Sequence, residues 1–296
     1  MSNLAALIDA LNSKAKSHHG KSPLGNLGVI SCYNTVHIRH VPFFEPCIII
    51  VLSGRKVIYD TNGPVTCAAN SAIVAPGPAS FDIRNEPDPH NGRYRALIVP
   101  FQQAHIERMR NAHAIQSPWH HEPANVLSFD HDLTLLEAVE HYLRTSGSPH
   151  LRDHRLMEIL LILAGKDARL LSYALSHQGW SQRVRAILGT DLAHEWVLRD
   201  ICTRLATSES SLRRNLNREN TNFRDLLYDL RLNAALTQLL QTSLPVYRIA
   251  TDCGYRSISR FTSNFHKRFG VPPTVFRASM NVSEQNLTVS GHRMIS

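Results

Sequence analysis

The spacing of apolar residues changes from short runs to helical periods near Phe101. Before it, from about Ser31, short apolar runs alternate with turn residues such as Ser53-Gly54, Thr61-Asn62-Gly63-Pro64 and Pro76-Gly77-Pro78. Repeated runs bounded by Gly, Pro and Asn are typical of strands in a small antiparallel barrel or sandwich. We therefore expect an all-β first half with strands over Cys47–Leu52, Lys56–Tyr59, Ser71–Val74 and Tyr94–Val99.

After Phe101, apolar residues recur every three to four positions, which predicts two amphipathic helices separated by the breaker Thr145–Pro149. The first apolar face contains Leu133, Leu136, Val139, Tyr142 and Leu143, and the second contains Leu156, Ile159, Leu160 and Leu163. This stripe has two interpretations, a homodimer seam or a cover for the β-rich part. The seam would use Leu136, Val139, Leu143, Leu156, Ile159 and Leu163.

A short helix, a turn and a polar helix follow Trp196. Positions 198, 201, 202 and 205 form one apolar face, and Thr207-Ser208 supplies a turn and an N-cap. The second helix, over 210–219, has Leu212 and Leu216 as its buried pair. Its other positions carry Ser, Arg and Asn, which suit hydrogen bonding to base edges and phosphates. This order is the helix-turn-helix pattern.

The same arrangement returns about fifty residues later. A helix over 246–253 leads to the turn Gly254-Tyr255, and Ser257 is placed to cap the next helix. The apolar edge of that helix consists of Phe261, Phe265 and Phe269. Its opposite side carries Arg256, Ser259, Arg260, Ser263, Asn264, Lys267 and Arg268.

One long helix is predicted between the two units, from Phe223 to Gln241. It contains neither Gly nor Pro, so it can act as a stiff spacer. We expect it to hold the two recognition helices about one DNA turn apart, roughly 34 Å, in successive major grooves. Its expected buried residues are Phe223, Leu226, Leu227, Leu230, Ala234 and Leu240.

The positive charge is concentrated in the same part of the chain. The formal net charge is +8, and the segment from Ser181 to Ser296 has 16 Lys and Arg against 9 Asp and Glu. The C-terminal two-fifths therefore carries +7 of the total, where a phosphate backbone could use it.

Several motifs of this region are shared with one known family. The matching residues are Trp196 and Leu198, Ser210-x-Leu212-x-Arg214, Arg231-x-x-x-Ala235, Ile249-Ala250-x-x-Cys253-Gly254-Tyr255, Ser259-x-Phe261-x-x-x-Phe265-His266-Lys267-x-Phe269-Gly270, Pro272-Pro273 and Arg277. Through them, Ser181–Ser279 resembles the DNA-binding domain of the AraC/XylS family of bacterial transcription regulators. His266 departs from the usual Phe, and Asn217 and Asn220 stand where Lys or Phe and Gly are common. Upstream, Glu45-Pro46 and Gly54-Arg55-Lys56 look similar to the family's N-terminal barrel.

The resemblance implies an α+β chain with an N-terminal cupin-like β-barrel, following helices and an all-α domain with two helix-turn-helix units. The expected divisions are an extension over 1–30, an effector or dimerisation domain over 31–180, the DNA-binding domain over 181–279 and a tail over 280–296. The implied function is sequence-specific promoter binding, with activation by contact with RNA polymerase. A small effector in the barrel and a homodimer are further implied partners, and no cofactor is expected.

The residues predicted to contact DNA lie on the two polar helices and at the second turn. They are Ser210, Ser211, Arg213, Arg214, Asn217, Arg218, Arg256, Ser257, Ser259, Arg260, Ser263, Asn264 and Lys267. Among them, we expect Arg213, Arg214, Arg256 and Arg260 to make the strongest contacts.

Other classes of protein have weaker support in the sequence. The 17 histidines, including His37, His40, His120 and His121, suggest two alternatives, a cupin-type metalloenzyme and a pH- or metal-sensing regulator. No His-x-His with a following Glu at cupin spacing occurs in the β-rich part, and no nucleophile triad or phosphate loop stands out, so no catalytic residue is expected. An adaptor, which would use its helices only for protein interactions, would need recognition helices that do not bind DNA. The Arg and Ser content of these helices disfavours this alternative.

Size and cysteines narrow the class further. At 296 residues and 43% hydrophobic content, two domains are the better expectation. The five cysteines are odd in number and contain no C-x-x-C pair, which favours buried, reduced thiols. No apolar run approaches the roughly 20 residues of a membrane helix, and Met1–Lys21 lacks a secretion signal, so a cytoplasmic location without membrane contact is expected.

Overall fold

The chain folds into two compact units in a computed structural model, which describes residues 4, 6–9, 28–113, 125–145, 148–167 and 179–280. One unit comprises 1–37 and 43–176, and the other comprises 38–42 and 177–296. Within the described residues, no helix is both long and apolar enough to cross a membrane.

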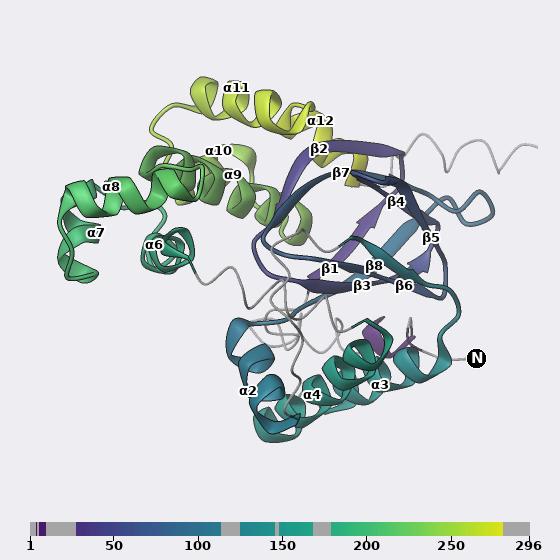
Figure 1. Ribbon diagram of the computed structural model, residues 1–296. Coiled ribbons are helices and arrows are strands. Elements are labelled where there is room, and N and C mark those ends of the chain that lie inside the picture. Colours follow the sequence, from purple (N-terminus) through teal and green to yellow (C-terminus); the bar gives the residue numbers. More distant parts are fainter. Residues whose placement is uncertain are drawn as a thin grey trace, which may run out of the picture. The chain divides into compact units, whose positions relative to one another are not determined.

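Two antiparallel sheets build the first unit (Figure 1). In the five-stranded sheet the order is β1-β8-β3-β6-β9, and in the four-stranded sheet it is β2-β7-β4-β5. The strands are β1 Gly28–Cys32, β2 Val36–Phe43, β3 Cys47–Ser53, β4 Arg55–Asp60, β5 Gly63–Ala68, β6 Ser71–Ala75, β7 Ala79–Glu86, β8 Tyr94–Pro100 and β9 Leu127–Phe129. The predicted cupin-like architecture is confirmed, with two facing sheets in place of a fully closed barrel.

Each of the four individually predicted strands is present, as β3, β4, β6 and β8. The remaining strands lie in stretches where apolar and polar residues mix, such as β2, in which the buried Val36 and Ile38 alternate with the exposed His37 and Arg39. The short strand β9 follows Phe101, where we expected helices, and it pairs with β6 through Ile73 and Ser128.

Tight connections join the sheets. Gly54 alone separates β3 from β4, which belong to different sheets, and its φ of +79° favours glycine. A Cβ at Gly54 would collide with the backbone oxygen of Glu86. Further on, Asp60 pairs with Gly63 across a two-residue turn. The edge strand β5 then accommodates Pro64, which cannot donate to a neighbouring strand.

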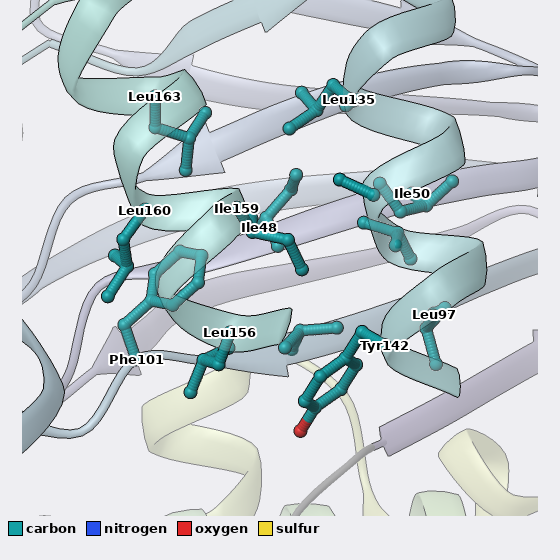
Figure 2. Close-up of a cluster of buried hydrophobic side chains, with 14 of the residues drawn as sticks. Ile48, Ile50, Leu97, Phe101, Leu135, Tyr142, Leu156, Ile159, Leu160 and Leu163 are labelled. Atoms are coloured by element: carbon teal, nitrogen blue, oxygen red, sulfur yellow. The ribbon is translucent and has the colours of Figure 1, made fainter. Parts of the chain in front are cut away.

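Helices cover the outer face of the five-stranded sheet, as Figure 2 shows for α3 and α4. The helices of this unit include α2 Gln103–His113, α3 Leu133–Arg144 and α4 Pro149–Lys166. Asp132 caps α3 by accepting a hydrogen bond from the backbone N–H of Leu135. Their apolar residues pack in one cluster with Ile48, Ile50 and Leu97 of the strands.

This packing decides between the two interpretations of the helical stripe. The six residues of the expected dimer seam are at most 5% exposed and lie in the cluster shared with the sheet. The seam prediction is therefore wrong, and the alternative, a cover for the sheet, is confirmed. Leu133 is 66% exposed because it is the first residue of α3 and lies outside the buried stripe.

The same core includes residues near the start of the chain. Leu4 and Ile8, in the segment expected as an extension, are buried in the cluster. The Arg95 guanidinium pairs with the Asp9 carboxylate. Part of residues 1–30 thus contributes to the packing of the first unit.

Helices build the second unit, where α7 and α8 form the first helix-turn-helix and α10 and α11 the second (Figure 1). The helices are α6 Trp180–Leu188, α7 Leu198–Arg204, α8 Glu209–Arg218, α9 Phe223–Gln241, α10 Val246–Asp252, α11 Ile258–Phe269 and α12 Pro273–Met280. The predicted all-α domain with its long spacer, α9, is confirmed.

Neighbouring helices surround the spacer, since α6, α10, α11 and α12 all contact α9. Of the six residues expected to be buried there, only Leu226 is, and the others are half-buried. The fully buried positions also include Leu232, Ala235, Leu236 and Leu239. The expected set of buried residues was wrong for the other five positions, because α9 contacts several helices along its length.

The two turns share one hydrogen-bond pattern. Thr207 donates its N–H to the Cys202 carbonyl, and Tyr255 donates to Ala250 in the same way. The residue preceding each donor has a positive φ, +48° at Ala206 and +77° at Gly254. The first turn thus places a strained alanine where the second has glycine.

We predict opposite effects for exchanging these two residues. Ala206→Gly should raise the free energy of unfolding by up to about 1 kcal/mol, because it relieves the left-handed strain. Gly254→Ala should lower it by about 2 kcal/mol or more, since strain adds to overlap with the Leu192 carbonyl and the Arg231 guanidinium. Urea unfolding measures both, and shifts in the same direction would contradict the assignment.

Candidate nucleic-acid interface

Each recognition helix begins at a serine N-cap, as the sequence predicted. Ser208 Oγ accepts a hydrogen bond from the backbone N of Ser211 at 3.2 Å, and Ser257 Oγ accepts from that of Arg260 at 3.3 Å. These bonds satisfy backbone donors that the first turn of a helix leaves unpaired. The hydroxyl of Ser257, a predicted DNA contact, is thereby used within the protein.

Buried residues orient both helices. Leu212 and Leu216 of α8 are at most 1% exposed, as are the three phenylalanines of α11. Phe261 contacts Tyr255 with ring centroids 5.2 Å apart, and Phe265 contacts Phe269 at 4.7 Å. Because these residues fix one face of each helix, the polar residues are directed to the opposite face.

The predicted residues of α8 largely lie on its exposed face. Ser211 is half-buried and Arg213 is paired with Glu209 at 3.2 Å, one helical turn away. The exposed members are Ser210, Arg213, Arg214, Asn217 and Arg218. The ion pair between Arg213 and Glu209 is exposed, so a DNA phosphate could replace the Glu209 carboxylate at little cost in free energy.

The predicted DNA contacts of the second helix-turn-helix also divide into exposed and half-buried residues. Asn264 is half-buried, and its side chain bonds to Tyr255 while its carbonyl accepts from Tyr228 Oη at 3.2 Å. Arg256 forms an exposed ion pair with Glu195. The exposed members on α11 are Ser259, Arg260, Ser263 and Lys267. Asn264 therefore contributes to packing, whereas these four form a polar surface.

Four cations of these surfaces form no ion pair with any described residue: Arg214 and Arg218 on α8, and Arg260 and Lys267 on α11. An unpaired exposed guanidinium or ammonium suits a phosphate or a guanine edge. In contrast, Arg268 of α11 forms an ion pair with Asp229 of α9 at 3.3 Å.

Arg231 of α9 joins the spacer to the segment that precedes α7. Its Nε donates to the Leu192 carbonyl at 3.0 Å, and its Nη2 donates to that of His194 at 2.9 Å. The same guanidinium lies against Gly254, in the turn of the second helix-turn-helix. Arg231 thus contacts the surroundings of both helix-turn-helix units.

Glu219 is a structural residue that sequence reasoning missed. Its carboxylate accepts the backbone N–H groups of Trp180 at 2.6 Å and Ser181 at 2.9 Å, at the start of α6. The N-cap of that helix, Gly179, has no side chain to perform this role. A cap supplied from about 40 residues away leaves no local signal in the sequence.

Ile258 is a surface residue that sequence reasoning also missed. It is the first residue of α11, between the cap Ser257 and Ser259, and it is 53% exposed. A large, exposed apolar side chain at the N-terminal end of a recognition helix is suited to contact a thymine methyl group. The sequence signal was present, an isoleucine directly after the cap, outside the i, i+4 row of phenylalanines.

The histidines singled out in the sequence do not assemble into a metal centre among the described residues, where no group of three ligating side chains occurs. His37 contacts Tyr59 with centroids 5.7 Å apart, and His40 lies in β2. His120 and His121 lie outside the described residues. All five cysteines are buried and free, as expected.

Two family models match the chain. A helix-turn-helix domain matches residues 201–279, which include most of the first helix-turn-helix, the spacer and the second helix-turn-helix. The ExsA N-terminal regulatory domain matches residues 46–173, which include most of the sheets and the helices that cover them.

Relatives in Escherichia coli are transcription regulators. The HTH-type transcriptional regulator YdeO of strain O157:H7 is 32% identical over 200 residues, covering 64% of this chain and 76% of YdeO. GadX of strain K12, another HTH-type transcriptional regulator, is 29% identical over 144 residues, covering 47% of this chain and 53% of GadX.

A solved structure shares the whole fold. ToxT from Vibrio cholerae, solved with a bound unsaturated fatty acid, superimposes with a TM-score of 0.63 and 16% sequence identity, covering 87% of this chain and 96% of ToxT. This likeness confirms the fold. The 32% identity to YdeO over 76% of its length, together with the helix-turn-helix domain match, establishes that the chain belongs to the AraC/XylS family of DNA-binding transcription regulators.

Proposed function

We propose that residues 181–279 read a bipartite promoter site, with α8 in one major groove and α11 in the next. Support comes from two capped helices whose exposed faces carry unpaired cations. Of these, α11 contacts the uninterrupted helix α9 directly, and α8 contacts α6, which in turn contacts α9. At 1.5 Å per residue, its 19 residues span roughly 28 Å, close to one turn of DNA. Among the expected contacts, Arg260 and Arg214 are the strongest candidates for bases, and Arg213 and Arg256 would exchange their carboxylate partners for phosphates.

The first unit would supply the regulatory input. The match to a regulatory domain supports this role, and ToxT carries a fatty acid in its solved structure. By analogy we assign a small-effector site to the sheets, activation through RNA polymerase to the DNA-bound state, and no catalytic activity to either unit. A homodimer would need a surface other than the buried stripe of α3 and α4.

Selection of bound duplexes from a random pool tests the proposed reading of DNA. We expect the purified chain to enrich two short sequence blocks whose centres lie about ten base pairs apart, one for each recognition helix. Enrichment of a single block would contradict the use of both units, and no enrichment would contradict sequence-specific binding.

Arg260→Ala should weaken binding to the selected duplex by about 1–3 kcal/mol if the guanidinium binds a guanine edge, and should relax preference at that base pair. Arg155→Ala is the control, because it also removes one exposed, helical arginine but lies in the first unit. Fluorescence anisotropy on selected and random duplexes measures both. Equal weakening on random DNA would make Arg260 a phosphate contact instead.

Ile258 provides a second test of direct base reading. Replacing single thymines of the selected duplex by uracil removes one methyl group each. At the contacted thymine, we expect this change to weaken wild-type binding by about 1 kcal/mol, the cost of exposing one apolar group. Ile258→Ala should lose sensitivity to the same change, giving a non-additive double-mutant cycle. Additive effects at every thymine would exclude the contact.

A further inference from the structure

A buried polar layer lies between the two sheets of the first unit. Lys56 of β4 is 1% exposed, and its strand neighbours in register are Asn85 of β7 and Cys67 of β5. Paired residues in register point to the same face of a sheet. Tyr94 of β8 approaches from the other sheet, with Lys56 Nζ 5.9 Å from its ring centroid. The layer thus joins both sheets.

Hydrogen-bond donors outnumber acceptors in this layer. Lys56 Nζ donates to Asn85 Oδ1 at 2.9 Å, which is its one hydrogen bond to the described residues. The other polar atoms of the layer, Asn85 Nδ2 and Tyr94 Oη, are buried and have no partner in the described part of the chain. A buried ammonium without a carboxylate is costly, and unpaired buried donors add to that cost.

We propose that this layer is a binding site for a short-chain carboxylate, which accepts hydrogen bonds from Lys56 Nζ, Asn85 Nδ2 and Tyr94 Oη. The carboxylate would supply both the missing negative charge and the missing acceptors. Ile58 and Ile83 follow Lys56 and Asn85 on the same face, are paired in register and are buried. A short aliphatic chain would pack against these two residues.

The chemistry of the neighbouring thiols favours a carboxylate over a redox centre. Burial raises the pKa of Cys32, Cys47 and Cys67 to about 12, so each thiol is protonated and weakly reactive near neutral pH. Burial also lowers the pKa of Lys56 to about 8, so the ammonium is largely charged at pH 7. The layer therefore presents one positive charge beside protonated thiols.

A regulatory use of this site rests on the proposed function, but binding can be tested without DNA. Thermal melting and calorimetric titration of the full chain with butyrate, and with neutral butyramide as the matched probe, measure it directly. We expect butyrate alone to stabilise the chain and bind. If the chain selected no DNA sequence, the proposed reading of DNA would be wrong, but butyrate binding would still stand. If butyrate did not bind, the carboxylate site would be wrong, but the reading of DNA would still stand.

Three variants locate the site. Lys56→Met should weaken butyrate binding by about tenfold or more, because a charge-assisted hydrogen bond is lost. Arg55→Met is the control, since Arg55 is adjacent on β4 but 58% exposed and bound to Glu86. Asn85→Asp should abolish butyrate binding without loss of stability at pH 7, because its carboxylate would pair with Lys56 inside the protein.

The dependence on pH has a defined sign. Butyrate binding should weaken as pH rises through about 8, where Lys56 loses its proton. Without ligand, the contribution of Lys56 to stability, measured as the difference from Lys56→Met, should increase from pH 8 towards 10.5, because this residue then binds more protons in the unfolded chain than in the folded chain. The comparison is needed because the buried thiols, whose pKa values are raised, act in the opposite direction in both proteins. Butyrate should reduce that increase.

Several results would overturn the proposal. They are equal stabilisation by butyramide, unchanged butyrate binding in both Lys56→Met and Asn85→Asp, loss of binding in Arg55→Met to the same extent, and no binding by the wild-type chain. Binding of inorganic phosphate but not butyrate would overturn the assigned ligand class.

Discussion

The attachment of helices to α9 determines how the second unit presents its two recognition helices. Arg231 bonds to two carbonyls in the segment before α7, Asp229 pairs with Arg268 of α11, and Tyr228 bonds to the Asn264 carbonyl. Partial burial raises the pKa of Asp229, although Arg268 and Arg185 lower it. These polar contacts supplement apolar packing and allow few relative orientations of the units, as a reader of successive grooves requires.

In the first unit, the outer face of the five-stranded sheet and the space between the two sheets have different roles. The outer face of the five-stranded sheet is apolar and packs under α3 and α4, so it contributes stability (Figure 2). The space between the sheets holds Lys56, Asn85 and Tyr94, which are poorly paired and cost free energy. Such a cost within an otherwise apolar core is typical of a site that serves function, and it is the reason for placing a ligand there.

Local signals made much of this fold predictable. Ser208 and Ser257 were identified as caps because a hydroxyl at that position satisfies backbone donors only a few residues away. The three phenylalanines of α11 were identified by their spacing, and Asn220, which stands where glycine is common in the family, adopts φ +53°. In each case sequence neighbours supply the determining contact, so the pattern is visible without the fold.

The sequence by itself determined the two helix-turn-helix units, the spacer and the β-rich first half, because periodicity, caps and turns act over a few residues. Only the tertiary structure decided which polar residues stay available. It assigned Asn264 to packing, used Glu219 to cap α6 and buried the expected dimer stripe against the sheet. It also gathered Lys56, Asn85 and Tyr94 from three strands. These outcomes depend on contacts between residues far apart in the chain, which no local pattern encodes.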